Sequence, residues 1–395
     1  MPAPPEVWAT TESIETASSI LSDLVNIASV NPSYPGGVGE GAVAEWLKER
    51  CRGIGLSVET QEVFPGRPNV LARLPADAGR GVLLFEAHLD TVSFGTPRME
   101  AAQIAGNLLY GRGACDTKGS LTAMLIALER LTKRTAELPV DILLLGAVDE
   151  ERSGGGARHF LISGGKADGA VVGEPTGLEI VVAHKGCIRF RIATRGRAAH
   201  SSKPEEGLNA IYAMNDVLSH LRSRLFPLAN KRRHERVGSP TWSVGVITGG
   251  ASVNIVPEQC SIELDYRSVP GEAVETVLAE VDTVLDQARG AHPGIAIERE
   301  DPFLVSWPLD TPISNRLVAA ALKAKRLNQE SLMGVPYGSD ASLLATFGEI
   351  PSIVLGPGDI NVAHGPEEHV DLREVALAAD LYENIAIEFD PSADR

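Results

Sequence analysis

The stretch Val82-Leu83-Leu84-Phe85-Glu86-Ala87-His88-Leu89-Asp90 decides how this 395-residue sequence is interpreted. Its first four residues form a continuous apolar run, which is typical of a strand covered by helices on both faces. His88 and Asp90 stand two residues apart, so both side chains project to one side where the strand ends. An ordinary salt bridge is one explanation for this pair. The other is a metal-binding histidine whose second ring nitrogen is held by a carboxylate.

Strands and helices are predicted to alternate on both sides of this stretch. Apolar runs favour strands over residues 82–87, 140–148, 170–172 and 353–355. Helical spacing of apolar residues favours helices over residues 13–28, 39–52, 121–131, 313–327 and 372–387. This alternation predicts an α/β domain with helices on both sides of its sheet.

A different order of elements is predicted from residue 187 to residue 301. Strands over 188–194, 242–248, 260–266 and 295–300 combine with helices over 207–225 and 272–288, and residues 228–240 are predicted to form a loop. The resulting β-α-β-β-α-β order is the ferredoxin-like unit, which folds as a domain of its own. We therefore predict a domain in two parts, residues 1–186 and 302–395, with a smaller domain inserted over residues 187–301.

Composition excludes several classes of function. The formal net charge of −16 argues against nucleic acid or an anionic membrane as a partner, since phosphate binding needs a cationic surface. The four cysteines are widely spaced and form no C-x-x-C pair, so neither a disulfide framework nor a thiolate zinc site is indicated. The beginning of the chain lacks the pattern of a secretion signal, and no run approaches the roughly 20 apolar residues of a membrane span. The expected location is the cytoplasm.

A glycine-rich segment, Gly111-Arg112-Gly113-Ala114-Cys115-Asp116-Thr117-Lys118-Gly119, leads into the helix predicted to end at residue 131. Asp116 stands at the entrance to that helix. It could be a simple N-cap, because aspartate is among the best capping residues. Alternatively, its carboxylate could bridge two cations.

Three consecutive acids, Asp149-Glu150-Glu151, follow the strand predicted over 140–148. A solvated acidic turn would explain them, but buried acids require a positive neighbour. In extended geometry Glu150 and Glu151 point opposite ways, so one could bind metal while the other faces a bound water. Two more potential ligands also follow strands: Glu174 comes after residues 170–172, and His364 comes after residues 353–355.

These scattered residues are expected to converge. An open α/β sheet binds ligands beyond the carboxyl ends of its strands, and that is where the candidates are predicted to lie. A set of imidazole and carboxylate ligands without thiolate suits zinc, with cobalt or manganese as possibilities. We therefore predict a metal site formed by His88, Asp116, Glu151, Glu174 and His364.

Together the motifs resemble the M20 metallopeptidase family, which includes acetylornithine deacetylase, succinyl-diaminopimelate desuccinylase, aminoacylase-1 and carboxypeptidase G2. The resemblance covers nearly the whole chain. It implies a zinc-peptidase-like catalytic domain with a mixed sheet, an inserted lid and dimerisation domain, and two divalent metal ions. By the family pattern, one ion is held by His88 and Glu174, the other by Glu151 and His364, and Asp116 bridges them. Glu150 matches the general base, and Asp90 matches the carboxylate that orients His88.

The resemblance also implies roles for residues outside the metal site. His200 in the inserted domain is expected to reach the active site of a partner subunit, which implies a homodimer. Arg267 is the candidate for binding a substrate carboxylate, since guanidinium binds carboxylate in a bidentate way. Asn254 resembles a second polar contact, and Ser339 lies where relatives form the substrate pocket. A helix-capping role for His200 and a surface role for Arg267 are the alternatives.

The preferred substrate is an N-acyl amino acid, because residues 355–364 resemble the acetylornithine deacetylase branch. His184-Lys185-Gly186 stands where desuccinylases carry an Arg-Arg-Gly-Ser-like stretch. A dipeptidase or carboxypeptidase would use the same chemistry. A binding protein without catalysis is the alternative from another class, and it is disfavoured because every ligand position is filled.

Overall fold

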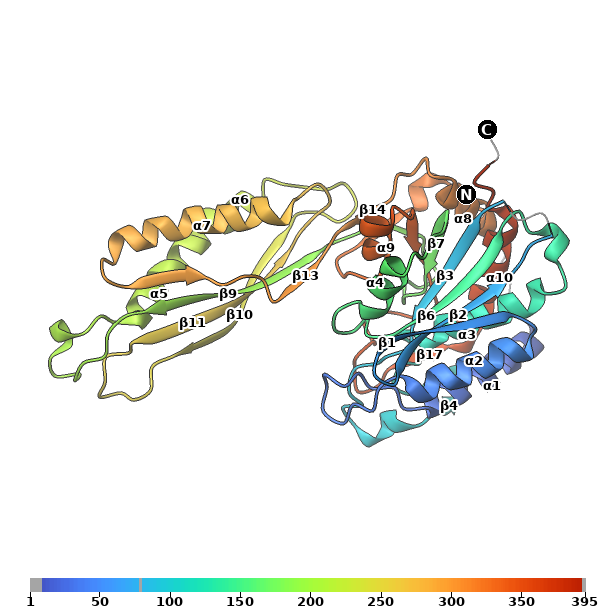
Figure 1. Cartoon of the computed structure of the whole chain (residues 1–395), viewed down its shortest axis with the longest axis horizontal. Coiled ribbons are helices and arrows are strands. Elements are labelled where there is room, and N and C mark those ends of the chain that lie inside the picture. Colours follow the sequence, from blue (N-terminus) through green and yellow to red (C-terminus); the bar gives the residue numbers. More distant parts are fainter. Residues whose placement is uncertain (1–8, 78–79, 393–395) are drawn as a thin grey trace. The chain divides into compact units, whose positions relative to one another are not determined.

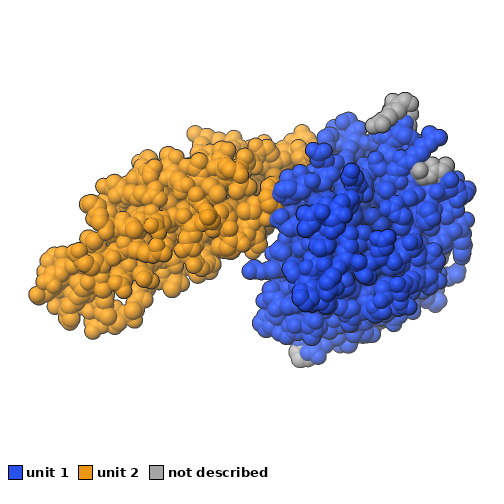
Figure 2. Space-filling view, in the orientation of Figure 1, with its two compact units in different colours: residues 1–182, 311–333, 339–395 blue, residues 183–310, 334–338 orange. Residues whose placement is uncertain are grey.

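The computed structural model describes residues 9–77 and 80–392. The chain divides into two compact units, shown in Figure 2. The first comprises Met1–Val182, Thr311–Met333 and Ser339–Arg395, and the second comprises Ala183–Asp310 and Gly334–Gly338. The short segment Gly334–Gly338 therefore groups with the second unit, although it lies far along the chain from the rest of it.

A nine-stranded mixed sheet forms the centre of the first unit and continues into strands at the unit boundary (Figure 1). Its strands follow the spatial order β1 (Ser57–Phe64), β2 (Arg67–Leu74), β6 (Asp141–Ala147), β3 (Val82–His88), β7 (Gly169–Val172), β16 (Ser352–Val354), β8 (Val181–His184) and β14 (Leu309–Asp310), and β15 (Met333–Val335) also pairs with β8. A separate small sheet contains β17 (His369–Asp371), β5 (Leu108–Tyr110) and β4 (Gln103–Ala105).

Helices cover both faces of the large sheet, as predicted. On one face, a continuous apolar core joins the sheet to α1 (Thr11–Asn26), α2 (Gly41–Gly53), α3 (Lys118–Leu131), α8 (Arg316–Lys325) and α10 (Leu372–Glu388). On the other face, α4 (Gly155–Ile162) and α9 (Ala341–Gly348) pack against each other and against the strands (Figure 1). The core is close-packed: the rings of Phe85 and Tyr382 lie 5.5 Å apart, and both are fully buried.

Local sequence explains where these helices begin and which face they bury. The hydroxyl of Thr10 accepts a hydrogen bond from the Ser13 amide at 3.2 Å and caps α1. The buried residues of α1 recur at helical spacing, from Ala17 through Leu21 to Leu24. The same rule holds for α10, in which the Asp371 carboxylate accepts from the Arg373 amide.

The direction of four strands matters most for function. β3 runs parallel to both β6 and β7, and β16 runs parallel to β7. Their carboxyl ends therefore open on the same edge of the sheet. The loops that leave this edge carry the polar residues singled out in the sequence.

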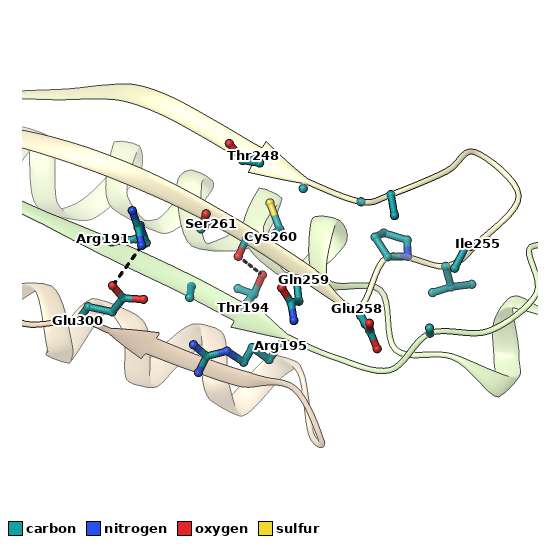
Figure 3. Close-up of a pocket in the computed structure, with 17 residues that line it drawn as sticks. Arg191, Thr194, Arg195, Thr248, Ile255, Glu258, Gln259, Cys260, Ser261 and Glu300 are labelled. Atoms are coloured by element: carbon teal, nitrogen blue, oxygen red, sulfur yellow. Dashed lines mark hydrogen bonds and ion pairs between the residues drawn. The ribbon is translucent and has the colours of Figure 1, made fainter. Parts of the chain in front are cut away.

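The second unit has its own sheet and core. Its strands follow the order β10 (Thr241–Gly249), β11 (Gln259–Arg267), β9 (Cys187–Arg195) and β12 (Ala296–Arg299), with β13 (Leu304–Ser306) also pairing with β9. One face packs on α5 (Ala210–His220) and α7 (Val274–Ala291), with Phe190 and Tyr266 in the core. Polar side chains such as Arg191 and Glu300 pair with each other and help to line the pocket of this unit drawn in Figure 3.

The predicted α/β fold with an inserted smaller domain is confirmed, but some predicted elements were wrong in detail. The helix predicted over 207–225 begins later, at Ala210, and its last predicted turn, Leu221–Leu225, is π-helical and leads into α6 (Phe226–Ala229). Leu221 and Leu225 are both buried, so the apolar spacing continues past the end of the α-helix. The loop predicted over 228–240 consequently starts inside α6.

Candidate metal centre

The carboxylate of Asp116 lies between two histidines. His88 Nε2 is 2.9 Å from Asp116 Oδ1, and His364 Nε2 is 3.1 Å from Asp116 Oδ2. His88 ends strand β3, Asp116 precedes helix α3, and His364 lies in the loop that follows β16. Because each oxygen of the carboxylate faces a different imidazole, Asp116 has the geometry of a group that bridges two cations.

Two glutamates stand beside these histidines. Glu151 Oε1 is 3.0 Å from His364 Nε2, and Glu174 Oε1 is 3.9 Å from His88 Nε2. All five residues predicted as metal ligands therefore come together at one edge of the sheet. Asp116 and Glu174 are also linked through their neighbours, because the Thr117 hydroxyl donates to the carbonyl of Gly173.

Glu150 is part of the same cluster. Ligand atoms of His88, Asp116 and Glu151 lie within 4.8 Å of one another, and so do those of His88, Glu150 and Glu174. The geometry thus places Glu150 within 4.8 Å of the histidine, in one cluster with Glu174, which is predicted to bind metal.

The cluster is electrostatically demanding. Burial raises the pKa of Glu150 and of Glu174 well above the ordinary carboxyl value, and neighbouring carboxylates add to the shift. Hydrogen bonds to Asp116 and Glu151 raise the pKa of His364 to about 10. Burial also acts on Asp116, but the hydrogen bonds from His364 and His88 outweigh it and lower the pKa. These carboxylates therefore favour positive charge in their midst.

The donor set fits divalent metal ions. Two imidazole nitrogens and several carboxylate oxygens are ligands that zinc accepts, and cobalt and manganese accept them as well. His88 Nδ1 lies 2.9 Å from the main-chain carbonyl of Asp90, which can only accept a hydrogen bond. Nδ1 therefore donates to this carbonyl, and Nε2, which faces Asp116, is the nitrogen that would give up its proton to bind a metal.

Asp90 does more than the sequence suggested. Its carboxylate Oδ1 lies 3.6 Å from His88 Nδ1, so the nearer partner of the imidazole is the main-chain carbonyl of the same residue. The two carboxylate oxygens instead accept from the main-chain amides of Glu150 and Glu151, at 3.0 and 3.2 Å. Asp90 thus fixes the acidic turn as well as lying beside the histidine.

A buried ion pair that the sequence analysis missed supports the bridging residue. Glu368 is fully buried and pairs with Arg112, and its Oε1 accepts from the amides of Cys115 and Asp116 at 3.1 and 3.2 Å. Arg112 also donates to the carbonyl of His364 at 3.3 Å. Arg112 stands in the glycine-rich motif beside Asp116, but nothing local pointed to Glu368 as its partner.

The remaining predicted site residues lie elsewhere. Ser339 is buried in the first unit, where its carbonyl accepts from the amide of Ser342 just inside α9. His200, Asn254 and Arg267 belong to the second unit. His200 and Asn254 are neighbours, because the carbonyl of Asn254 accepts from the Ser201 amide at 3.0 Å and His200 bridges to Ile255.

Arg267 stands at the opposite end of that unit's sheet. The β9–β11 ladder pairs Arg195 with Gln259 at one end, next to the loops of His200 and Asn254. It ends at the pair Ile188–Tyr266, next to Arg267. At about 3.4 Å per residue the ladder is roughly 25 Å long. Within one chain, therefore, His200 and Arg267 are too far apart to touch the same small molecule.

A family model described as peptidase family M20/M25/M40 matches residues 84–388, which contain all five predicted metal ligands. The chain belongs to this family. The resemblance inferred from the motifs is thereby confirmed. As a member of the M20 family, the protein is a metal-dependent hydrolase of peptide or amide bonds. Among the described residues, no helix has the length and apolar composition needed to cross a membrane.

Solved structures share the fold of this M20 protein at low sequence identity. An aminopeptidase from Bacillus cereus is 23% identical, with a TM-score of 0.78, over 95% of this chain and 98% of that one. An M20 metallo-carboxypeptidase from Sulfolobus solfataricus is 21% identical, with a TM-score of 0.75, over 96% and 100%. A dinuclear metal-binding M20 peptidase from Bacillus subtilis is 17% identical, with a TM-score of 0.71, over 96% and 98%.

The role of the Arg112–Glu368 ion pair beside Asp116 can be tested by mutation. Replacing Glu368 with Gln removes the charge that holds Arg112 and weakens the acceptor for two amides. We expect zinc affinity to fall about 10- to 100-fold, as is typical when a group supporting a ligand is lost. Zinc titration against a competing chelator measures this change. Glu367→Gln, at the exposed neighbouring position, is the control, and equal affinities in the two variants would contradict the role of Glu368.

Proposed function

We propose that the protein is a dinuclear zinc hydrolase that cleaves the amide bond of an N-acyl amino acid. The carrying observation is the Asp116 carboxylate, each oxygen of which faces a different histidine. On this proposal one metal is held by His88 and Glu174, the second by Glu151 and His364, and Asp116 belongs to both. Two bound ions would polarise the scissile carbonyl and lower the pKa of a water between them.

Glu150 is the proposed general base. It adjoins the ligand Glu151 in the acidic turn, and its main-chain amide is held by Asp90. Burial raises the pKa of Glu150 well above the ordinary carboxyl value, which makes its carboxylate a stronger base than that of an exposed glutamate. Glu150 takes a proton from the attacking water and delivers it to the departing amine nitrogen. A general base must face the attacking water, so its carboxylate cannot also be a permanent metal ligand.

Arg267 is proposed to bind the substrate carboxylate. Its Nε donates to Asp265 Oδ1 at 2.8 Å, and the same carboxylate accepts from Arg189 at 2.7 Å. Asp265 thus fixes the orientation of the guanidinium. A positively charged fork suits the free carboxylate of an N-acyl amino acid or of a peptide C-terminus equally well. Ser339 is proposed as a further contact from the first unit.

His200 and Asn254 are proposed to serve the active site of a partner subunit in a homodimer joined through the inserted domain, residues 187–301. The roughly 25 Å between the two ends of the β9–β11 ladder supports this assignment. An N-acyl amino acid is far shorter than that distance. If Arg267 binds the substrate in its own subunit, His200 of the same chain cannot reach it. His200 would then supply a hydrogen bond to the tetrahedral oxyanion of the partner's substrate.

A dipeptidase or carboxypeptidase is the second candidate, and the structural similarity to an aminopeptidase and a metallo-carboxypeptidase favours it. A panel of N-acetyl amino acids, N-succinyl amino acids and dipeptides, assayed with zinc or cobalt, separates the two. The proposal predicts the highest kcat/KM for an N-acetyl amino acid. Preference for dipeptides would establish the peptidase, and preference for N-succinyl substrates a desuccinylase. No turnover of any amide by metal-loaded protein would leave only a binding function.

The roles of the adjacent glutamates can be separated by two matched variants. Glu150→Gln should retain the wild-type zinc content while kcat falls by about 10²- to 10⁴-fold, because a general base is lost. Glu151→Gln should lose zinc, because a ligand is lost. Metal analysis and steady-state kinetics on both proteins check this. Loss of zinc from Glu150→Gln would show that Glu150 is a ligand, as its position beside His88 and Glu174 also allows.

The dimer proposal predicts complementation between two inactive variants. Mixed dimers of Glu150→Gln and His200→Ala contain one site in which both residues are intact. After dissociation and random reassociation of equal amounts, half of the dimers are mixed. About a quarter of wild-type activity should therefore return, as expected for a two-fold symmetric dimer. If no mixing ratio restores activity, His200 does not act on a partner.

A further inference from the structure

The acidic turn that carries Glu150 is fixed by a set of carboxylates. Each main-chain amide in Asp149-Glu150-Glu151 donates to a carboxylate oxygen. The Asp149 amide donates to Glu40 Oε1 at 3.0 Å, and the next two amides donate to the oxygens of Asp90 at 3.0 and 3.2 Å. The conformation of the turn thus depends on two acids, and both of them are buried.

Such a group of buried carboxylates needs positive partners, because an unpaired buried charge is strongly destabilising. Arg67 of β2 supplies the charge. Its Nε and Nη2 donate to the two oxygens of Glu40 at 2.5 and 2.7 Å, and Nη2 also donates to Asp149 Oδ1 at 2.9 Å. The guanidinium of Arg67 therefore contacts both Glu40, which accepts from the Asp149 amide, and the side chain of Asp149, the first residue of the turn.

Asn31 completes the connection. Its side-chain nitrogen donates to Asp149 Oδ1 at 2.9 Å and to Asp90 Oδ2 at 2.8 Å. Arg67, Glu40, Asp149, Asn31 and Asp90 therefore form one continuous hydrogen-bonded network, which we name the turn clamp. It reaches Glu150 only through the main chain, so the carboxylate of Glu150 is left for chemistry.

The turn requires such support because its backbone is unusual. Asp149 has a φ of 68°, in the left-handed region that aspartate tolerates better than most residues. Asn69, two residues after Arg67 on β2, also holds this loop, by accepting from the Val148 amide at 3.1 Å and donating to the Gly156 carbonyl at 2.9 Å. Strand β2 therefore fixes the whole connection from β6 to α4, on both sides of the acidic turn.

We propose that Arg67, acting through Glu40 and the turn clamp, is a positioning residue for the general base Glu150. The inference rests on the proposed function of Glu150. Arg67 touches neither substrate nor metal in this scheme. Its effect is to hold the Glu150 carboxylate at the distance and angle at which proton transfer occurs, where a displacement of about 1 Å can cost 100-fold in rate.

Arg67→Met tests the proposal, and Arg73→Met is the matched control. Arg73 lies on the same strand and pairs with Asp141 at 2.9 Å, in a half-exposed ion pair that has no contact with the turn clamp. We expect Arg67→Met to lower kcat about 10- to 100-fold while KM and zinc content stay within twofold of wild type. Arg73→Met should match the wild type. Arg67→Lys, which keeps the charge but not the two-pronged contact, should fall between them.

Two outcomes would overturn the proposal. One is a loss of zinc from Arg67→Met with an unchanged rate per bound metal pair, which would mean that Arg67 supports the ligands. The other is additivity with Glu150: in a Glu150→Gln background, Arg67→Met should change the residual kcat less than threefold, because the group it positions is already gone. A full additional loss would show that Arg67 acts by another route.

The test remains informative if Arg67→Met does not fold or if the wild type cleaves no amide. Glu40→Gln preserves shape and removes one charge, and it should give the same kcat-specific loss in folded protein. Without a substrate, hydrogen exchange at the amides of Glu150 and Glu151 reports on the turn directly. The proposal predicts at least tenfold faster exchange in Arg67→Met or Glu40→Gln than in Arg73→Met. Equal exchange would contradict the turn clamp, whatever the enzyme's substrate.

Discussion

The central constraint on the structure is that several carboxylates must lie close together at one edge of a sheet, around the carboxylate of Asp116. Strand direction places them there, because β3, β6, β7 and β16 are parallel and end on the same side. Like charges at this spacing repel one another, and burial increases the cost. The two histidines that face Asp116 offset part of that charge, and divalent metal ions are the partners that the donor set fits.

Two ion pairs, one buried and one partly buried, support this arrangement. Arg112 and Glu368 fix the main chain around Asp116 and the carbonyl of His364. Arg67 and Glu40 fix the main chain of the acidic turn. Each pair acts on the main chain of the site and leaves the functional carboxylates free. The two ion pairs therefore fix the geometry of the site, while the clustered carboxylates of the site remain available for metal binding and proton transfer.

Much of the fold and the centre could be predicted because their signals are local. His88, Glu151 and Glu174 each stand at or just after a strand, and an apolar run followed by a polar ligand can be recognised within a few residues. β4, β5 and β17 were not predicted: three residues are too few to show a period, and β4 and β17 are not continuous apolar runs like residues 170–172 and 353–355. β1 and β2 were also missed. Five of the eight residues of β1 are charged or polar and none of the eight is fully buried, so it shows no apolar face.

The supporting ion pairs could not be predicted for a different reason. Arg112 meets Glu368, and Arg67 meets Glu40, only after distant parts of the chain have packed together. No spacing rule connects such residues in one sequence. The substrate could not be predicted on similar grounds, because the groups proposed to select it lie in the second unit and in loops. The metal chemistry, by contrast, follows from residues whose placement the strands determine.

Zinc stoichiometry of Asp116→Asn tests the central claim most directly. If Asp116 bridges two ions, wild-type protein binds two zinc ions per chain, and the single substitution weakens both sites together, so that calorimetric titration shows neither at wild-type affinity. Glu174→Gln, which removes a ligand proposed to serve one ion, should leave the other site in place. An Asp116→Asn protein that still binds one zinc ion with wild-type affinity would contradict the bridge, and with it the account of the centre.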